Sequence, residues 1–281
     1  MTQPRVASLH LYPVKGARAI DVDAARVGVE GVIVAGVGDR EWMLVDSDGR
    51  FITQRSHHRL ALVGIAIGER HLQLSVPGGE TIGVALDAPR TVARDVVVWR
   101  SAVRGFDEGD EVAAAVSRFL GEPLRLVRFD PALPRLCNPD FAGDSGAHTR
   151  YADGYPLLII GAASLRDLNA RLLDKGTAAL PMNRFRPNIV VDGIEAFDED
   201  HIDTLAINGI VMKMVKPCIR CIVTTIDQAS ATAGEEPLLT LSGYRQHATL
   251  GGIHFGMNAI IVRGAGGRVS AGDTTQIEWT F

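Results

Sequence analysis

Residues 216–227 read KPCIRCIVTTID, and the rest of the sequence can be organised around this stretch. It contains two of only three cysteines, Cys218 and Cys221, with Arg220 between them and a β-prone run at 222–226 behind them. Thiolates are soft ligands suited to soft metals, and a neighbouring cation favours the ionised thiol. We therefore hypothesise that Cys221 binds a metal-containing cofactor.

The spacing of the two cysteines alone leaves several alternatives open. A C-x-x-C pair is half of a zinc site, a dithiol redox pair, or two buried small hydrophobic residues. The sequence has no second C-x-x-C and no H-x-x-x-H, which disfavours zinc. A thioredoxin-type pair belongs at a helix start, whereas residues 222–225 are typical of a strand. Two inert, buried thiols remain an alternative.

Several cations lie beside glycines, turns or short strands, where phosphate groups are often bound. They are Lys15, Arg40, Arg184, Arg186, Lys216 and Arg220. The alternative is that each is a solvated surface charge. Residues 183–188, NRFRPN, precede an apolar strand, and strand alternation predicts that Arg184 and Arg186 point to the same side.

The histidines indicate little. His57 and His58 are adjacent, so in a strand they would face opposite sides and would not share a metal. His148 and His254 are weak candidates for a position near a site.

Composition indicates a folded, soluble protein. The 281 residues are 46% hydrophobic and 22% charged, enough for one large domain or two smaller ones. The net charge of -4, from 33 acidic and 29 basic side chains, argues against a nucleic-acid or anionic-membrane partner. The first ten residues lack a signal-peptide pattern, and three cysteines make no disulfide framework, so we expect a cytoplasmic protein with free thiols.

The sequence of the first half of the chain predicts mostly strands. Alternation predicts strands at 7–11 and 72–76, a hairpin joins 42–45 to 51–53, and a strand buried on both faces is expected at 96–99. A helix is predicted at 111–120 and a strand at 124–129. Residues 131–149 are rich in proline and glycine, which predicts a linker between domains at 1–130 and 150–281.

The second half continues this pattern. Strands are predicted at 155–160, 188–191, 259–262 and 276–281, and Asn208-Gly209 predicts a hairpin within 205–215. Ser164 with Asp167 predicts a capping box that opens a second helix. Two helices among a dozen strands predict a mainly β, α+β fold of packed barrels or sandwiches.

Several blocks, in order, resemble a known family. The stretch 216–227, RFRPNIVV at 184–191 and AASLRDLN at 162–169 are similar to the MOSC domain, named for the C-terminal part of molybdenum cofactor sulfurase. LYPVKG at 11–16, Asp39-Arg40 with Trp42, and FITQR at 51–55 resemble the β-barrel domain that precedes MOSC. The combination resembles the mitochondrial amidoxime-reducing components and their bacterial counterparts that confer resistance to N-hydroxylated bases.

The resemblance implies a molybdenum-pyranopterin oxidoreductase that reduces N-hydroxylated compounds such as hydroxylamines, amidoximes and N-hydroxy bases. It implies electrons from a separate flavin or iron-sulfur protein, and Cys221 as metal ligand and catalytic residue. It places cofactor contacts on Lys15, Gly16, Arg40, Asp153, Gly154, Arg186, Ile219, Arg220 and Asn258. Ile219 replaces a serine common in the family, and Asn258 stands where some members have tyrosine.

Under this resemblance, Arg220 and Lys216 would keep Cys221 deprotonated, and the N-terminal segment must fold back onto the MOSC half. The alternatives are a sulfur carrier that holds a persulfide on Cys221 and a cofactor-binding protein without turnover.

Overall fold

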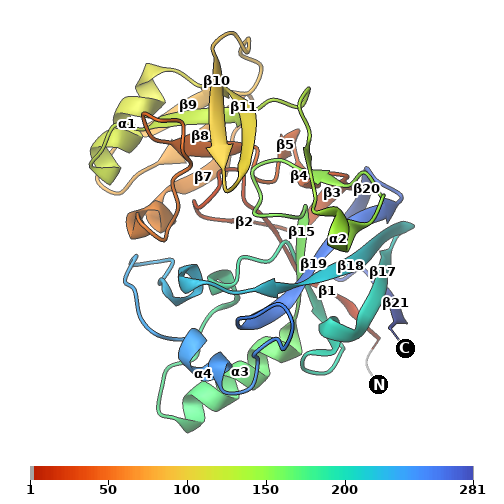
Figure 1. Cartoon of the computed structure of the whole chain (residues 1–281). Helices are drawn as coiled ribbons and strands as arrows, with labels where there is room; N and C mark the ends of the chain where they lie inside the picture. Colours follow the sequence, from red (N-terminus) through yellow and green to blue (C-terminus); the bar gives the residue numbers. More distant parts are fainter. Residues whose placement is uncertain (1–2, 281) are drawn as a thin grey trace.

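The computed structural model describes residues 3–280, and its largest element is an eight-stranded sheet (Figure 1). Its strand order is β2-β1-β16-β15-β19-β18-β17-β21. Only β15 and β16 pair in parallel; the other neighbours are antiparallel. The strands are β1 (Arg5–Leu11), β2 (Ile20–Val22), β15 (Leu157–Gly161), β16 (Ile189–Asp192), β17 (Ile202–Ile207), β18 (Ile210–Ile219), β19 (His254–Arg263) and β21 (Gln276–Trp279).

The two halves of the chain exchange strands. The N-terminal strand β1 pairs with β16, with Arg5 opposite Asp192 and Leu9 opposite Ile189. In return, β20 (Gly267–Ser270) from the C-terminal region pairs with β3 (Ala24–Gly28). One hydrophobic core, with buried residues such as Leu11, Trp42 and Leu205, runs through both halves. The N-terminal segment therefore does fold back onto the second half.

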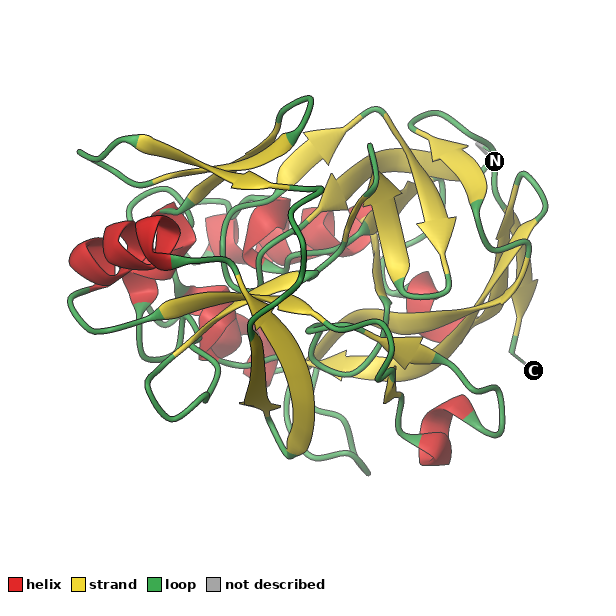
Figure 2. Cartoon of the chain, turned by 90° about the horizontal axis from the view of Figure 1, so that it is seen from above, coloured by secondary structure: helices red, strands yellow, loops and turns green. Residues whose placement is uncertain are grey.

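Smaller sheets complete the β structure. Their orders are β10-β11-β12-β6, β20-β3-β4-β5, β7-β8-β9 and β13-β14. The remaining strands are β4 (Gly31–Val34), β5 (Val37–Gly38), β6 (Trp42–Val45), β7 (Gly64–Ile67), β8 (His71–Ser75), β9 (Thr81–Ala85), β10 (Ala93–Val98), β11 (Ser101–Asp107), β12 (Arg125–Phe129), β13 (Arg135–Leu136) and β14 (His148–Thr149). The predicted mainly β, α+β fold with few helices is confirmed, and Figure 2 shows the helices as short segments beside the strands.

Two helices were expected, and the described residues contain four: α1 (Asp110–Leu120), α2 (Pro139–Ala142), α3 (Ala162–Asp174) and α4 (Leu238–Ser242). Short 3-10 segments occur at His58–Leu62, Met182–Arg184, Asp198–His201 and Ile222–Thr225. The predicted helix at 111–120 is confirmed, and it ends at Gly121 with φ 90°. The extra helices α2 and α4 are single turns, too short for a periodic apolar pattern to reveal. The domain limits at 130 and 150 stay a prediction.

The predicted capping box at Ser164 is wrong. Helix α3 begins two residues earlier, and Ser164 lies inside its first turn. The distant Glu199 supplies the cap instead, because its carboxylate accepts hydrogen bonds from Gly161 N at 3.1 Å and Ser164 Oγ at 2.6 Å. A carboxylate at a helix N-terminus is also favoured by the helix dipole. This partner is remote in sequence, so no local pattern predicts it.

Other local predictions had mixed outcomes. The hairpin at Asn208-Gly209 is confirmed, with φ of 49° and 83°. The strand at 96–99 is not buried on both faces, because Val97 is 37% exposed between two buried valines. That strand lies in a small antiparallel sheet with one face toward solvent. The last predicted strand is present as β21, although its final residue, Phe281, lies outside the described residues.

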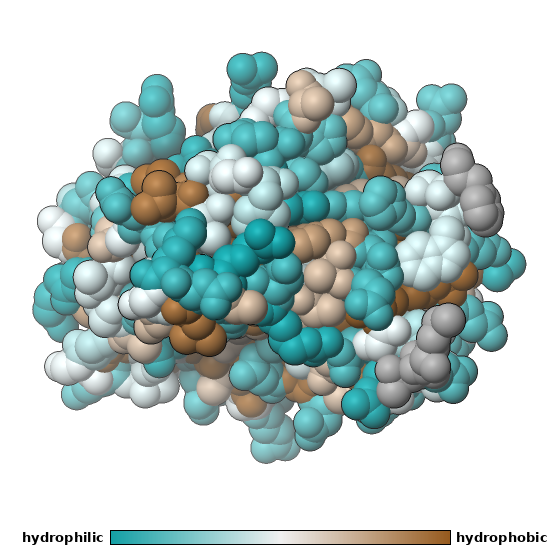
Figure 3. Space-filling model, turned by 90° about the horizontal axis from the view of Figure 1, so that it is seen from below, coloured by the Kyte–Doolittle hydropathy of each residue, from teal (hydrophilic) through white to brown (hydrophobic). Residues whose placement is uncertain are grey.

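The surface shows no broad apolar area on the face seen from below. Figure 3 shows small hydrophobic patches separated by hydrophilic side chains on that face. Across residues 3–280, no helix combines the length and the apolar character needed to cross a bilayer.

Candidate functional site

A cavity of about 150 Å³ lies between the two halves of the chain and collects all ten predicted site residues. Its lining includes Lys15, Gly16, Arg40, Asp153, Gly154, Arg186, Ile219, Arg220, Cys221 and Asn258. These residues come from six separate stretches of sequence. The fold therefore brings residues that are far apart in the sequence together in one cavity.

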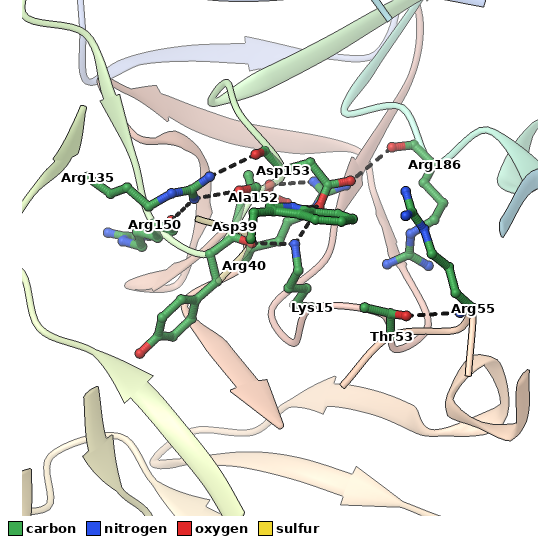
Figure 4. Close-up of polar contacts among 12 residues, drawn as sticks. Lys15, Asp39, Arg40, Thr53, Arg55, Arg135, Arg150, Ala152, Asp153 and Arg186 are labelled. Carbon is green, nitrogen blue, oxygen red and sulfur yellow. Dashed lines mark hydrogen bonds and ion pairs between the residues drawn. The ribbon is translucent and has the colours of Figure 1, made fainter. Parts of the chain in front are cut away.

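Lys15 follows β1 and lies at the centre of the polar lining. Its Nζ atom donates to Asp153 Oδ1 at 2.5 Å and to the Tyr151 carbonyl at 2.8 Å. Burial lowers the pKa of Lys15, and the attraction of Asp153 partly offsets this effect. Gly16 has φ 83°, and an added Cβ would lie 2.5 Å from Leu60 Cδ2, so the turn requires glycine. Figure 4 shows Lys15 and Asp153 between Arg135 on one side and Arg55 and Arg186 on the other.

Arg40 and Arg186 come from different halves of the chain and stack on the same ring. Their guanidinium carbons lie 4.2 Å and 4.4 Å from the Tyr12 ring centroid. Both have left-handed backbones, with φ of 45° and 58°, an uncommon conformation that is enriched at functional sites. Burial lowers the pKa of Arg186 to about 10 and raises that of Tyr12 to about 12. Stacking on the fully buried Tyr12 fixes where these two cations lie.

The prediction that Arg184 and Arg186 point to the same side is wrong, because the segment is not a strand. Arg184 ends a 3-10 turn, and its Nη2 donates to Asp227 Oδ2 at 2.9 Å. Arg186 instead donates from Nη1 to the Ala17 carbonyl at 2.9 Å and lines the cavity. Arg184 thus braces the segment after Cys221.

The segment after Cys221 also differs from expectation. Residues Ile222–Thr225 form a 3-10 turn rather than a strand, and Cys221 is its N-terminal flanking residue. The Oγ1 atoms of Thr224 and Thr225 donate to the carbonyls of Cys221 and Ile222 at 2.9 Å and 2.8 Å. Threonine hydroxyls that bond to nearby carbonyls compete with strand pairing, which explains the turn. The 3-10 turn after Cys221 therefore replaces the strand context that disfavoured a dithiol redox pair.

Arg220 does not contact the predicted thiol. Its Nη1 atom donates to Cys218 Sγ at 2.8 Å, and its Nη2 donates to the Phe185 carbonyl at 2.6 Å. Lys216 lies with Nζ 4.2 Å from the Phe141 ring centroid. The expectation that Arg220 and Lys216 keep Cys221 deprotonated stays a prediction, and the hydrogen bond of Arg220 is made to Cys218.

The histidines take no part in the cavity lining. His57 Nε2 lies 2.8 Å from Glu122, and His254 Nε2 lies 3.3 Å from Asp200. His148 approaches Glu30 at 3.8 Å.

Sequence reasoning missed several lining residues and the residue beneath two of the cations. Gln54, Arg55 and Trp99 are among the missed lining residues, and Tyr12 is the missed ring on which Arg40 and Arg186 stack. Gln54 and Arg55 lie within the resembling block at 51–55, and Tyr12 within that at 11–16, so both blocks carried a signal. Trp99 had no such signal, because its sequence context predicts the end of a buried strand at 96–99.

The lining fits an anionic group next to a soft ligand. Five cations, Lys15, Arg40, Arg55, Arg186 and Arg220, line the cavity with one carboxylate, Asp153. The Nε atom of Arg220 is buried and has no hydrogen-bond partner among residues 3–280. Within that range, no three His, Cys, Asp or Glu side chains form a metal-binding cluster, so a metal at Cys221 would need ligands from elsewhere. Such a donor set suits a metal that arrives in an anionic cofactor.

Comparison with known proteins identifies two domain families and several related proteins. The MOSC N-terminal beta barrel domain matches residues 3–123, and the MOSC domain matches residues 147–276. Mitochondrial amidoxime reducing component 2 of Rattus norvegicus is 37% identical over 247 residues, covering 85% of this chain and 72% of its own length. Mitochondrial amidoxime-reducing component 1 of Homo sapiens is 35% identical, covering 86% and 72%.

A solved structure of the YuaD protein from Bacillus subtilis covers 100% of this chain and 98% of its own, at 12% identity and a TM-score of 0.44, which carries no functional argument. The two domain matches and the amidoxime-reducing relatives place the chain in the MOSC family, in the branch that includes the mitochondrial amidoxime-reducing components.

Proposed function

We propose that this protein reduces N-hydroxylated compounds, such as amidoximes and hydroxylamines, with a molybdenum-pyranopterin cofactor bound in the cavity. The observation that carries the proposal is the convergence of all ten predicted residues on one cavity. The names of the relatives, amidoxime-reducing components, support the substrate class.

The residues divide into two roles toward the cofactor. Cys221 would bind the metal through its thiolate. Arg40, Arg186 and Arg220 would bind the anionic phosphate, since guanidinium groups form paired hydrogen bonds with phosphate oxygens. Lys15 would add a point charge, and Gly16, Gly154, Ile219 and Asn258 would contact the cofactor at the lining.

The reaction consumes two electrons and two protons for each amidoxime, cleaves the N–O bond, and yields the amidine and one water. When bound, the cofactor supplies a two-electron redox centre that accepts oxygen. A separate flavin or iron-sulfur protein would supply the electrons. The three cysteines are free thiols, which supports a reducing location such as the cytoplasm.

Metal and pterin quantification tests the proposal. Protein freshly purified from a host that makes the cofactor should contain about one molybdenum and one pterin per chain, as expected for a single thiolate ligand. It should then reduce benzamidoxime with a chemically reduced viologen as donor. Absence of molybdenum would reject both the enzyme and a storage protein, and a Cys221 persulfide seen by mass spectrometry would then favour the sulfur carrier. Molybdenum without turnover would favour storage.

A further inference from the structure

A second hollow, of about 520 Å³, opens beside the cofactor cavity. The two share four lining residues, Trp99, Asp153, Gly154 and Tyr155. The second hollow does not include Cys221, and its lining adds Phe51, Arg100, Ser101, Arg135, Leu136, Asn138 and Lys216. A molecule in this hollow therefore lies next to the cofactor cavity without occupying it.

Trp99 forms the boundary between the two hollows. It lies in the two-residue turn between β10 and β11 with φ 56°, which is a strained conformation for a bulky aromatic residue. Its Nε1 atom donates to Asp153 Oδ1 at 3.1 Å, and its ring lies edge-on to Phe51 with centroids 4.8 Å apart. The Arg55 guanidinium lies 4.6 Å from the ring. Three contacts thus fix the indole, which is still 37% exposed and available for stacking.

The charge of the second hollow is positive. Arg100, Arg135 and Lys216 line it, and Asp153 is its one carboxylate. Lys15 already pairs with Asp153, so that charge is compensated. Within residues 3–280, Arg135 donates to three backbone carbonyls, those of Arg150, Ala152 and Asp153.

None of the ion pairs formed among residues 3–280 includes Arg100 or Lys216, although Lys216 Nζ lies 4.2 Å from the Phe141 ring centroid. Uncompensated cations that line a hollow attract an anionic group. A flat aromatic wall and uncompensated cations together favour a planar ligand that carries a negative charge.

Resting on the proposed function, we propose that this second hollow is the substrate subsite and selects planar N-hydroxylated compounds with an anionic substituent. The ring of the substrate stacks on Trp99, its N–O group reaches toward the cofactor cavity, and its anionic group lies near Arg100 and Lys216.

Two substrates that differ by one charge test this directly. The ratio of kcat/KM for 4-carboxybenzamidoxime to that for benzamidoxime should exceed one in the molybdenum-loaded protein. Arg100→Gln should lower this ratio about threefold, the effect expected for one partly exposed ion pair. The matched control is Arg118→Gln, which removes the same charge from the exposed face of α1, outside both hollows. This control should leave the ratio unchanged.

Binding of the products separates this inference from the proposed function. Calorimetry should show 4-amidinobenzoate binding more tightly than benzamidine, with the difference reduced in Arg100→Gln, whether or not turnover occurs. If neither amidoxime is reduced but this binding preference is present, the second hollow is still a binding site for planar anionic ligands and the proposed reaction fails. If benzamidoxime is reduced but wild type shows no preference for the carboxylated substrate or product, the subsite is overturned. A preference that Arg118→Gln lowers as much as Arg100→Gln would also overturn it.

Discussion

Arg220 donates a hydrogen bond from Nη1 to the Sγ atom of Cys218, at 2.8 Å, and makes none to Cys221. The same guanidinium donates to the Phe185 carbonyl at 2.6 Å, so it is held from two sides. Cys218 therefore helps to fix a cation of the cavity lining, while Cys221 remains available as a ligand. The two cysteines therefore differ in their contacts with Arg220.

We expect Cys221→Ser and Cys218→Ser to have different effects on the loaded protein. Cys221→Ser should abolish reduction of benzamidoxime, because a hydroxyl is a poor replacement for a soft thiolate ligand. Cys218→Ser should only weaken it, because serine still accepts a hydrogen bond from Arg220. Rates with a viologen donor and molybdenum content per chain measure both. Equal loss in both variants would refute Cys221 as the single ligand.

Tyr12 should matter for its ring and not for its hydroxyl. Tyr12→Leu removes the surface on which Arg40 and Arg186 stack, and each contact is worth about 0.5–2 kcal/mol. We expect lower stability and loss of pterin during gel filtration. Tyr12→Phe is the matched control, because the Tyr12 hydroxyl is buried without a hydrogen-bond partner among the described residues. Pterin loss from the phenylalanine variant as well would show that stacking is not the cause.

The helix cap supplied by Glu199 gives a stability prediction with a pH dependence. Ser164→Ala removes the 2.6 Å hydrogen bond to the buried Glu199 and should cost about 1–3 kcal/mol. Burial raises the pKa of Glu199 above its unfolded value, so the folded state binds a proton more readily. The free energy of unfolding therefore falls as pH rises through this pKa, and the variant should lose stability over a wider pH range.

Urea unfolding at several pH values measures this effect. Asp167→Asn is the control, because Asp167 pairs with the exposed Arg171 and the substitution should cost about 0.3–0.5 kcal/mol. A larger loss of unfolding free energy in Asp167→Asn than in Ser164→Ala would support the capping box that the sequence predicted.

The sequence predicted elements whose signals are local. The turn at Asn208-Gly209 and the helix that ends at Gly121 are present because left-handed residues and apolar periodicity act over a few positions. The cap of α3 and the contacts of Arg220 depend on Glu199 and Cys218 in their folded positions, which propensity does not describe. The residues that line the cavity were predicted from the family resemblance. The spacing of the two cysteines alone did not decide between a metal ligand and a buried thiol. Neither the local sequence signals nor the family resemblance identified Trp99 as a lining residue.

Cys137 should be the least reactive of the three thiols. It is 5% exposed, and burial raises its pKa to about 11, with a small opposing effect from Arg135. At pH 8 the thiol at this position is therefore almost entirely protonated. Cys218 and Cys221 are partly exposed. Iodoacetamide treatment of cofactor-free protein at pH 8, followed by peptide mass spectrometry, should label these two before Cys137.

The same burial makes Cys137 a source of alkaline destabilisation. Its pKa in the folded state, about 11, exceeds the ordinary value of 9.0, so the folded protein retains a proton that the unfolded chain loses. The free energy of unfolding should therefore fall as pH rises from about 9 to about 11. Cys137→Ala should flatten this part of the pH profile. Labelling of Cys137 as fast as Cys221, or an unchanged profile in Cys137→Ala, would contradict the prediction.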